Sequence, residues 1–489
     1  MSAHFLAFDL GAESGRAISG RFRGGLLDIQ EVHRFPNEPV RQNGSLHWDV
    51  LRLWLEMRRA LERLSTPTLD SLGVDTWGCD YALIGEQGTL LQNPYHYRDR
   101  RTDGVMNAVF ERVPAEEIYR VTGIQFLPFN TLFQLYAASQ ATPRLLDAAV
   151  TLATIPDLLN YWLTGQLVSE FTNATTTQFV DARARTWAAG LLSDLGLPTR
   201  LLPRLIEPGA VVGKLGAEVS APLAGTPVVA PACHDTGSAV ASVNVSGGRA
   251  FLSSGTWSLL GTEIPEPIIT DRSRELNFTN EGGVCGTTRL LKNIAGMWLL
   301  QACLRSWAGF GLRFEYGELL GAASDDRHAF KSLFDPDHAA FLHPVCMVTA
   351  ISAYCRDTGQ PEPDSPAAFT RAILESLAFK YRFVVDSLEE LTGTRIEQIQ
   401  IVGGGSRNRL LNQFTADATG RPVLAGPIEA TALGNIAMQM VATGAVASLG
   451  AAREIIERSF PAERFEPEAT DRWDAHARRF RQYLELTCV

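Results

Sequence analysis

The sequence lacks the features that mark a membrane, secreted or nucleic-acid-binding protein. No apolar stretch approaches the length of a membrane span. No basic region with a long apolar core precedes the first predicted strand, so we expect no signal peptide. The seven cysteines are scattered and form no C-x-x-C pair, which favours reduced thiols in a cytoplasmic protein. With a net charge of −10 and no Lys/Arg block, neither nucleic acid nor an anionic membrane is an expected partner.

Two common nucleotide-binding motifs are also missing. No GxxxxGK[ST] sequence occurs, which excludes a P-loop, and the glycine-rich stretch at 403–405 is not a dinucleotide G-x-G-x-x-G because position 408 is Asn. An acidic protein can still bind a nucleotide if backbone N–H groups and a metal ion supply the local positive field.

What the sequence does have is length and a regular alternation of predicted strands and helices. Its 489 residues exceed one ordinary core, so two or more domains are expected. Hydrophobic residues make up 45% and charged residues 20%, which is typical of a globular protein.

The first motif is a strand–turn–strand at the N-terminus. Residues 5–11 form an apolar strand that ends in Asp9 and Gly11, and residues 16–22 alternate as a returning strand. Ser14 and the turn amides can donate to phosphate oxygens, and Asp9 can hold a magnesium ion through water. A plain hairpin turn with an Asx-type bond is the alternative.

A similar plan returns near the middle of the chain. Residues 251–261 again read as strand, Gly/hydroxyl turn and strand, with Ser253–Thr256 as the turn. This coarse repeat indicates duplication and predicts two domains, 1–244 and 245–489.

A third candidate turn is Gly403–Gly405, between a predicted strand and a predicted helix. A glycine-rich turn at a helix N-terminus suits close approach of a nucleotide. Tight packing of the helix on the sheet is the alternative, although three consecutive glycines exceed what packing needs.

A carboxylate precedes the second half of the chain. Residues 228–230 predict a buried strand, and His234 and Asp235 lie where a small-residue helix starts. Asp235 is a candidate general base, and a helix N-cap is the alternative; the two roles are not exclusive.

Other stretches carry less specific expectations. Residues 71–76 predict a strand that runs into a Gly turn ending at Asp80, and 97–102 is either a solvated loop or a wall of hydrogen-bonding groups for a polyhydroxyl ligand. Residues 172–177 are predicted to be a strand edge or a loop. Residues 290–307 are predicted to be one amphipathic helix, with Asn293 at its beginning and Gln301 two turns on.

Taken together, these motifs resemble the FGGY family of carbohydrate kinases, of the actin-like ATPase superfamily, along nearly the whole chain. The matching stretches are 9–16, 75–80, 97–99, 123–131, 172–178, 234–236, 252–259, 279–283 and 401–405. The resemblance implies an α/β fold of two actin-like (ribonuclease H-like) domains, a sugar-binding and a nucleotide-binding one, with an ATP/sugar cleft between them.

The resemblance also implies a role for individual residues. Asp235 would be the base, and Asp9 would contact Mg2+ through water. The residues implied in ATP binding are Ala12, Glu13, Ser14, Gly15, Arg16, Thr256, Gln301 and Gly404. The residues implied in sugar binding are Gly78, His234, Asp235, Thr236 and Asn293. Glu13 departs from the Ser or Thr that members often carry, so its side chain is expected to point away from the phosphates or to approach the metal.

The expected activity is ATP-dependent, magnesium-assisted phosphorylation of L-rhamnulose at its C1 hydroxyl, by a cytoplasmic monomer or homodimer. Kinases for fuculose or xylulose, and a non-catalytic sugar- or nucleotide-binding protein on the same scaffold, are the alternatives. Asp235 together with intact phosphate turns favours the enzyme, because a protein that only binds has no need of a base.

Overall fold

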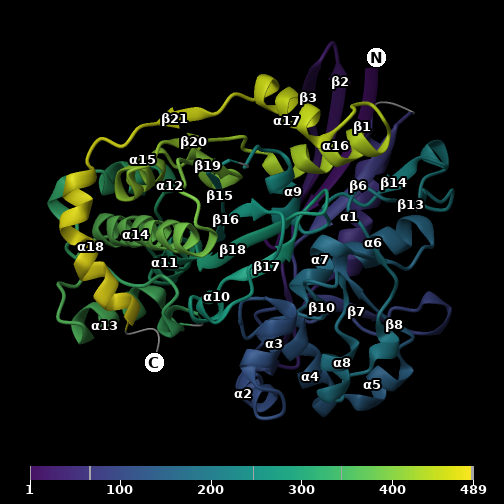
Figure 1. Cartoon of the computed structure of the whole chain (residues 1–489), viewed down its shortest axis with the longest axis horizontal. Coiled ribbons are helices and arrows are strands. Elements are labelled where there is room, and N and C mark those ends of the chain that lie inside the picture. The colour runs from purple at the N-terminus through teal and green to yellow at the C-terminus, as the bar shows by residue number, and fades with distance from the viewer. Residues whose placement is uncertain (1, 65–67, 246, 343, 486–489) are drawn as a thin grey trace. The chain divides into compact units, whose positions relative to one another are not determined.

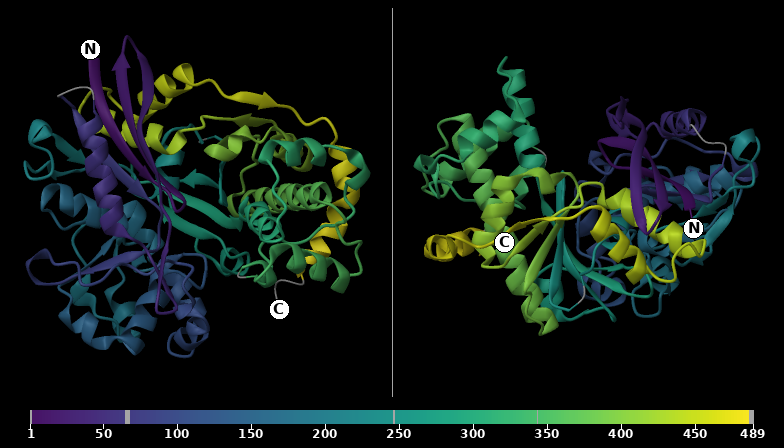
Figure 2. Two further views of the ribbon diagram at one scale, coloured as in Figure 1. Left: turned by 180° about the vertical axis from the view of Figure 1, so that it is seen from behind. Right: turned by 90° about the horizontal axis from the view of Figure 1, so that it is seen from above.

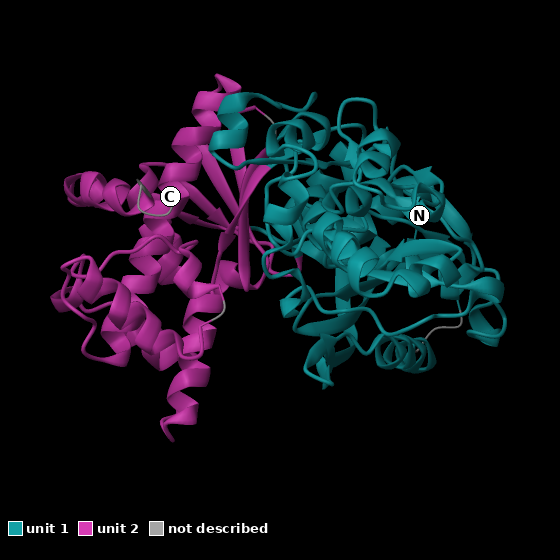
Figure 3. Cartoon of the chain, turned by 90° about the horizontal axis from the view of Figure 1, so that it is seen from below, with its two compact units in different colours: residues 1–244, 263–290, 430–461 teal, residues 245–262, 291–429, 462–489 magenta. Residues whose placement is uncertain are grey.

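The computed structural model describes residues 2–64, 68–245, 247–342 and 344–485. Contacts divide the chain into two compact units, which we describe separately (Figure 3). Unit 1 comprises Met1–Asn244, Glu263–Leu290 and Ala430–Pro461, and unit 2 comprises Val245–Thr262, Leu291–Glu429 and Ala462–Val489. The units are thus discontinuous in sequence, and the predicted pair of domains, 1–244 and 245–489, stays a prediction.

Unit 1 is built on a six-stranded sheet in the order β13-β14-β6-β1-β2-β3 (Figure 1). Its strands are β1 (Ser2–Leu10), β2 (Ser14–Arg23), β3 (Leu26–Pro36), β6 (Ser71–Thr76), β13 (Val211–Lys214) and β14 (Pro227–Val229). The predicted hairpin at residues 5–22 is confirmed, since β1 and β2 pair antiparallel. Strands β1, β6 and β14 are parallel, so the segments that follow them meet at one edge of the sheet.

Helices cover both faces of this sheet (Figures 1 and 2). They are α1 (Val50–Arg63), α6 (Ile155–Thr164), α16 (Ala430–Ala442) and α17 (Leu449–Ser459). Successive residues of a strand point to opposite faces. Leu6 and Phe8 of β1 therefore pack with α1 and α6, whereas Phe5 and Ala7 pack with α16 and α17. Asp9 continues the second series and lies on the α16 face.

A second, mainly helical core completes unit 1. It includes residues of α2 (Val105–Phe110), α4 (Thr131–Ala141), α5 (Pro143–Ala148), α8 (Ala189–Asp194) and the hairpin of β7 (Tyr81–Ile84) with β8 (Thr151–Thr154). Helix α4 begins after Asn130, whose side chain donates to Gln125 O and Gln178 Oε1 and makes no cap bond.

Unit 2 repeats the same strand plan in the order β18-β16-β15-β19-β20-β21. These strands are β15 (Arg249–Ser254), β16 (Trp257–Ile264), β18 (Thr288–Ala295), β19 (Gln398–Val402), β20 (Val423–Ala425) and β21 (Glu463–Phe465). Strand β15 pairs antiparallel with β16 and parallel with β19, as β1 pairs with β2 and β6. The two units therefore share one plan, as the repeat at 251–261 predicted, and the expected α/β fold class is confirmed.

The main helices of unit 2 are α11 (Trp298–Gly309), α12 (Tyr316–Ala323), α13 (Met347–Asp357), α14 (Pro366–Thr392), α15 (Arg409–Thr419) and α18 (Thr470–Glu485). The long helix α14 is capped by Ser365 and ends at Gly393, which has a φ of 66°.

The predicted strand edge or loop at 172–177 is wrong, because this stretch forms the helix α7 (Phe171–Thr176). Two features overcome the low helix propensity of threonine. Glu170 caps the N-terminus, and the hydroxyls of Thr175, Thr176 and Thr177 each donate to the carbonyl three residues earlier. The hydroxyls thus bond locally instead of competing with the helix.

The single helix predicted over 290–307 is also wrong. Its first part is strand β18, and α11 begins only at Trp298, so Asn293 lies on a strand and Gln301 on a helix. A short apolar run fits a buried strand as well as a helix. Gly296 lies between the two elements. Its packing requires glycine, because a Cβ there would lie 2.7 Å from the carbonyl carbon of Trp257.

Candidate active site

Asp9 and Arg16 form an ion pair at the end of the β1–β2 hairpin in unit 1. The two residues face each other in the strand register, and Asp9 is buried. The guanidinium thus offsets the charge of a carboxylate that the strand places inside the protein.

The turn between β1 and β2 is closed by a bond of 3.0 Å from Gly11 N to Ser14 O. Asn37 holds it from outside, donating from its side chain to Gly11 O and from its backbone to Glu13 O. Glu13 itself is exposed. The structure therefore places Ala12–Arg16, the predicted phosphate-binding residues, on one fixed turn and the start of β2.

Packing against Phe35, and not only the close approach of phosphate that the motif implied, explains why position 15 is glycine. A Cβ at this position would lie 2.3 Å from the ring of Phe35. Its packing against β3 already requires glycine, so a close approach to phosphate is not needed to explain it.

Asp75 is a carboxylate whose role the sequence did not indicate. It lies opposite Asp9 on the parallel strand β6, is fully buried, and accepts a bond of 2.6 Å from the side chain of Asn435 on α16. Burial, and then the neighbouring Asp9 charge, raise the pKa of Asp75 well above its ordinary value. The pairing of β1 with β6 was the signal that could have found it.

Asp235 is the first residue of helix α9 (Asp235–Ala241), and His234 holds the N-cap position. The alternative prediction, that Asp235 is a helix N-cap, is therefore wrong. Its carboxylate accepts from the backbone and hydroxyl of Thr236, and its side chain is 30% exposed. A half-exposed carboxylate at the sheet edge is available to a substrate hydroxyl.

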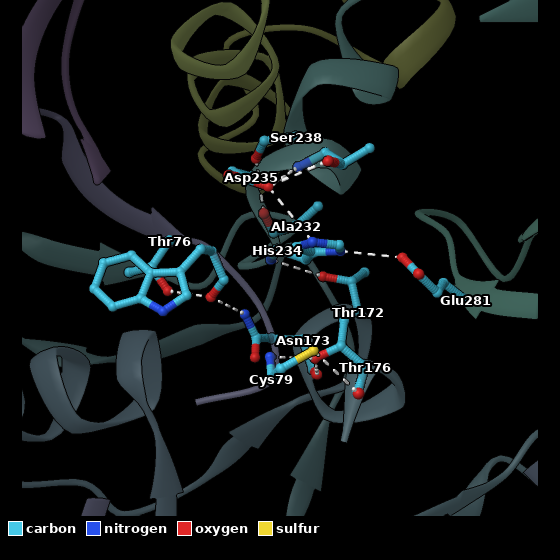
Figure 4. Close-up of polar contacts among 12 residues, drawn as sticks. Thr76, Cys79, Thr172, Asn173, Thr176, Ala232, His234, Asp235, Ser238 and Glu281 are labelled. Atoms are coloured by element: carbon cyan, nitrogen blue, oxygen red, sulfur yellow. Dashed lines mark hydrogen bonds and ion pairs between the residues drawn. The ribbon is translucent and has the colours of Figure 1, made fainter. Parts of the chain in front are cut away.

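His234 lies between Asp235 and Glu281 of β17 (Thr279–Gly282), as Figure 4 shows. Its Nε2 is 3.5 Å from Asp235 Oδ1, and its Nδ1 is 3.2 Å from both Glu281 Oε2 and Arg289 Nη2. His234, Glu281 and Arg289 are all buried. The imidazole is therefore held on both sides by Asp235 and by Glu281 and Arg289, for which the sequence had predicted no role.

Gly78 lies in the turn after β6, close to α7. A Cβ at Gly78 would be 2.9 Å from Thr176 Oγ1, and the next residue, Cys79, has a φ of 70°. A non-glycine residue in this left-handed region is strained unless its surroundings fix it. Here the Cys79 carbonyl accepts from Thr131 Oγ1 (2.6 Å) and Gln134 Nε2 (3.2 Å).

Asp80, which ends this turn, holds neighbouring side chains in place. Its Oδ2 accepts from the indole N–H groups of Trp48 and Trp77 and from Tyr97 N, and Oδ1 accepts from Gln134 Nε2. Burial raises its pKa to about 6, and these hydrogen bonds offset only part of that rise. Asp99 likewise accepts from Leu46 N, so part of the 97–102 cluster is structural.

In unit 2 the turns after β15 and β19 lie at one sheet edge, because these strands are parallel neighbours. A Cβ at Gly405 would lie 2.1 Å from Ser254 Oγ, so the two turns touch. A Cβ at Gly404 meets nothing within 4 Å among the described residues. Gly404 therefore faces open space, whereas packing alone explains Gly405.

The N-terminus of α11 joins the same edge. Met297 N and Trp298 N donate to the carbonyls of Gly255 and Thr256, both at 3.0 Å. Gln301 lies one turn further, and its Oε1 is buried with no hydrogen-bond partner in the described part of the chain. Thr256, Gln301 and Gly404 thus lie at the same edge of the unit 2 sheet. The unpaired Gln301 Oε1 and the open space at Gly404 would both suit a bound polar molecule.

Two kinds of feature are not found among the residues that the structure describes. Among the residues that the structure describes, no three His, Cys, Asp or Glu side chains are grouped closely enough to hold a metal ion. Magnesium keeps several of its waters, so binding through water by Asp9 alone stays a prediction. Within the described ranges, no helix is both long and apolar enough to cross a membrane.

Comparison with known proteins gives a consistent result over nearly the whole chain. The N-terminal domain model of the FGGY family of carbohydrate kinases matches residues 4–241, and the C-terminal domain model matches 250–443. A rhamnulokinase of Bacteroides thetaiotaomicron is 44% identical over 480 residues, which cover 97% of this chain and 98% of the relative. A rhamnulokinase of Pectobacterium atrosepticum is 45% identical over 482 residues, with 98% and 96% covered.

Solved structures agree in fold. A xylulose kinase from Rhodospirillum rubrum matches with a TM-score of 0.78 and 19% identity, covering 99% of both chains. A glycerol kinase from Plasmodium falciparum with ADP matches with a TM-score of 0.77 and 16% identity, covering 100% of this chain and 98% of that one. At such identities the likeness shows the fold alone.

We predict that the melting temperature falls as the pH rises from about 5 to about 7.5. Burial raises the pKa of Asp80 and Asp157 to about 6 and that of Glu170 to about 7. The folded state therefore keeps protons that the unfolded chain has already released. The resulting stability is present at low pH and is lost as the pH rises through the folded-state pKa values. Scanning calorimetry across this range checks the slope.

The Asp157→Asn variant is the matched test. Asn can still accept from Glu170 N and donate to the hydroxyls of Thr154 and Ser169, which now donate to Asp157. One titrating group is gone, so the melting temperature should fall less steeply with pH. An unchanged slope in this variant, or a wild-type melting temperature that rises over this range, would contradict the explanation.

Proposed function

Because the chain belongs to the FGGY family of carbohydrate kinases, we propose that it transfers the γ-phosphoryl group of ATP to the C1 hydroxyl of L-rhamnulose. The products are L-rhamnulose 1-phosphate and ADP. The observation that carries the proposal is the 44–45% identity with rhamnulokinases over 97–98% of the chain. Free cysteines among the described residues and the use of ATP support a cytoplasmic location.

In this proposal Asp235 is the general base that takes the proton of the C1 hydroxyl. Its partial exposure leaves the carboxylate accessible, and His234 on one side and Thr236 on the other fix its orientation. Gly78, His234, Thr236 and Asn293 are the proposed sugar-binding residues. Phosphoryl transfer depends mainly on such positioning, together with stabilisation of charge on the transferred group.

The nucleotide is proposed to contact two sets of residues. Ala12–Arg16 would receive the phosphates through backbone amides and side chains, and Thr256, Gln301 and Gly404 would bind the rest. The orphaned Gln301 Oε1 and the open space at Gly404 support this assignment. Asp9 would hold the hydrated magnesium ion that accompanies ATP, through water.

The substrate assignment predicts that L-rhamnulose gives the highest kcat/KM in a panel with L-fuculose, D-xylulose and glycerol. A site built to hydrogen-bond particular hydroxyls rejects analogues that leave its groups unpaired, and for glycerol we expect a loss of more than about 100-fold. Sugar-dependent ADP release, measured with a coupled assay, provides the values. A preference for xylulose or glycerol would show that the family is right and the sugar is wrong.

The base assignment predicts that Asp235→Asn lowers kcat by about 10²- to 10⁴-fold. The amide oxygen can still accept from Thr236 N, and His234 still occupies the N-cap position, so the melting temperature and ATP binding should stay near wild type. Asp271→Asn is the control, because Asp271 also begins a short helix in unit 1 and is exposed. Near-normal turnover in Asp235→Asn would remove Asp235 from the reaction.

The nucleotide assignment predicts that Gly404→Val raises KM for ATP about 10- to 100-fold, with KM for the sugar little changed. The variant should fold, since the added side chain meets no described atom within 4 Å of its Cβ. Gly405→Val is the contrast: its Cβ would overlap Ser254, so it should lower the melting temperature. Equal changes in both KM values for Gly404→Val would favour a purely structural role for this turn.

A further inference from the structure

Helix α7 and the buried Glu170 before it have no role in the site as described so far. Glu170 is fully buried, yet its carboxylate accepts hydrogen bonds from several donors. Oε1 accepts from Thr172 N (2.9 Å), and Oε2 accepts from Thr172 Oγ1 (2.7 Å), Asn173 N (3.2 Å) and Cys233 N (2.9 Å). A helix cap needs only the bonds to the amides of Thr172 and Asn173. The bonds to Cys233 and to the Thr172 hydroxyl go beyond capping.

These additional bonds lead to the segment that carries the base. Glu170 holds Cys233 N, and Thr172 Oγ1 accepts from His234 N at 3.3 Å. The two residues immediately before Asp235 are therefore bound through their backbone amides to the start of α7, as the position of Thr172 beneath His234 shows in Figure 4. The segment is also joined to β6, because Thr76 N donates to Cys233 O at 2.9 Å.

The same helix holds the turn of Gly78 from its other end. Thr176 Oγ1 accepts from Cys79 N at 3.0 Å, and Asn173 Nδ2 lies 3.4 Å from both Trp77 O and Cys233 O. Side chains one turn apart on α7 thus contact both the Gly78 turn and the His234–Asp235 segment (Figure 4).

Glu170 is in turn fixed from behind. Asp157 of α6 accepts from Glu170 N at 3.1 Å through Oδ1, and its Oδ2 accepts from the hydroxyls of Thr154 and Ser169. Two buried carboxylates are therefore linked in series, and each accepts hydrogen bonds from N–H and O–H donors. Such a satisfied network specifies one arrangement of the groups it joins.

We infer that Glu170 is a positioning residue for the phosphoryl transfer: through Cys233 and Thr172 it sets where the backbone of His234 and Asp235 lies relative to the Gly78 turn. This inference rests on the proposed function, since it takes Asp235 as the base. A base must lie within hydrogen-bond reach of the proton it removes. A displacement of about 1 Å lowers the rate by about 100-fold.

The test uses Glu170→Gln in the full-length protein. The amide can present its oxygen at only one of the two positions, so its NH2 group must face an N–H or O–H donor at the other. We expect kcat to fall about 10- to 100-fold, KM for the sugar to rise, and KM for ATP to stay within about twofold. Thr172→Val removes the hydroxyl that accepts from His234 N and should act in the same direction if Glu170→Gln does not fold.

The control is Thr177→Val. Thr177 is buried next to the end of the same helix, but among the described residues its hydroxyl hydrogen-bonds only to Ala174 O and Phe179 N. It should leave kcat within about twofold of wild type. A loss of kcat in Thr177→Val equal to that in Thr172→Val would indicate general loosening of α7 and overturn the inference.

A double-mutant cycle separates positioning from stability. If Glu170 acts through the base, Glu170→Gln should lower the residual turnover of Asp235→Asn little further, because the group it positions is already inactive. Full additivity of the two losses, or wild-type kcat in both Glu170→Gln and Thr172→Val, overturns the inference. If the wild-type chain prefers another ketose, the substrate proposal fails alone and the cycle is run with that sugar. Absence of turnover with every sugar overturns both.

Discussion

The pairing of three parallel strands, β1, β6 and β14, is the constraint on which the candidate site of unit 1 depends. Their carboxyl ends meet at one edge of the sheet, so Asp9, Asp75 and the segment before Asp235 come together although they are far apart in sequence. Bringing carboxylates together raises their pKa values and opposes folding unless partners compensate. Arg16 compensates at Asp9, and Asn435 donates to Asp75. The side chain of Asn435 is itself fixed by Gln439, which also bonds to Ser71 and Leu6, so α16 supports the acidic edge from beneath the sheet.

A second group of buried carboxylates lies behind the residues proposed to meet the substrate. Asp80 fixes Trp48, Trp77 and Tyr97, while Glu170 fixes the amides of α7 and Cys233. Burial disfavours the charged form of these carboxyl groups and so raises their pKa. Their ionisation in the folded protein is therefore destabilising. They accept several directed bonds in return, which an apolar side chain of similar volume cannot do. The buried carboxylates therefore lower the stability of the protein at neutral pH, but their hydrogen bonds fix the positions of the groups around the proposed site.

Much of this arrangement could be predicted from the sequence, and the failures have physical reasons. The strand–turn–strand pattern at residues 5–22 and its repeat at 251–261 were readable because glycine and hydroxyl residues interrupt short apolar runs. Helix α7 could not be predicted, since threonine-rich sequences favour strands, and the Glu170 cap and the threonine hydroxyl bonds that stabilise the helix leave no hydrophobic period in the sequence. Strand β18 was mistaken for helix because a short apolar run has no decisive period.

The predicted site residues also include some that could be found from the sequence and others that could not. Roles could be predicted from motifs for Asp235 and the glycine turns. No role could be predicted for Asp75, Glu281 and Arg289, because a strand register and contacts with His234 bring them to the predicted site. Glycines also needed the structure for their interpretation. Gly15 and Gly405 are explained by packing against Phe35 and Ser254, and only Gly404 keeps open space for a ligand.

The shared strand plan of the two units makes clear that the fold alone does not decide the chemistry. In unit 1 the last two residue pairs of the hairpin next to the parallel strand are Asp9–Arg16 and Leu10–Gly15, and in unit 2 they are Ser253–Leu259 and Ser254–Ser258. The pairs in unit 1 include the ion pair of Asp9 with Arg16, whereas the pairs in unit 2 carry only hydroxyl and apolar side chains. The same strand plan thus occurs twice, and the residues at the strand ends make one hairpin end charged and the other uncharged.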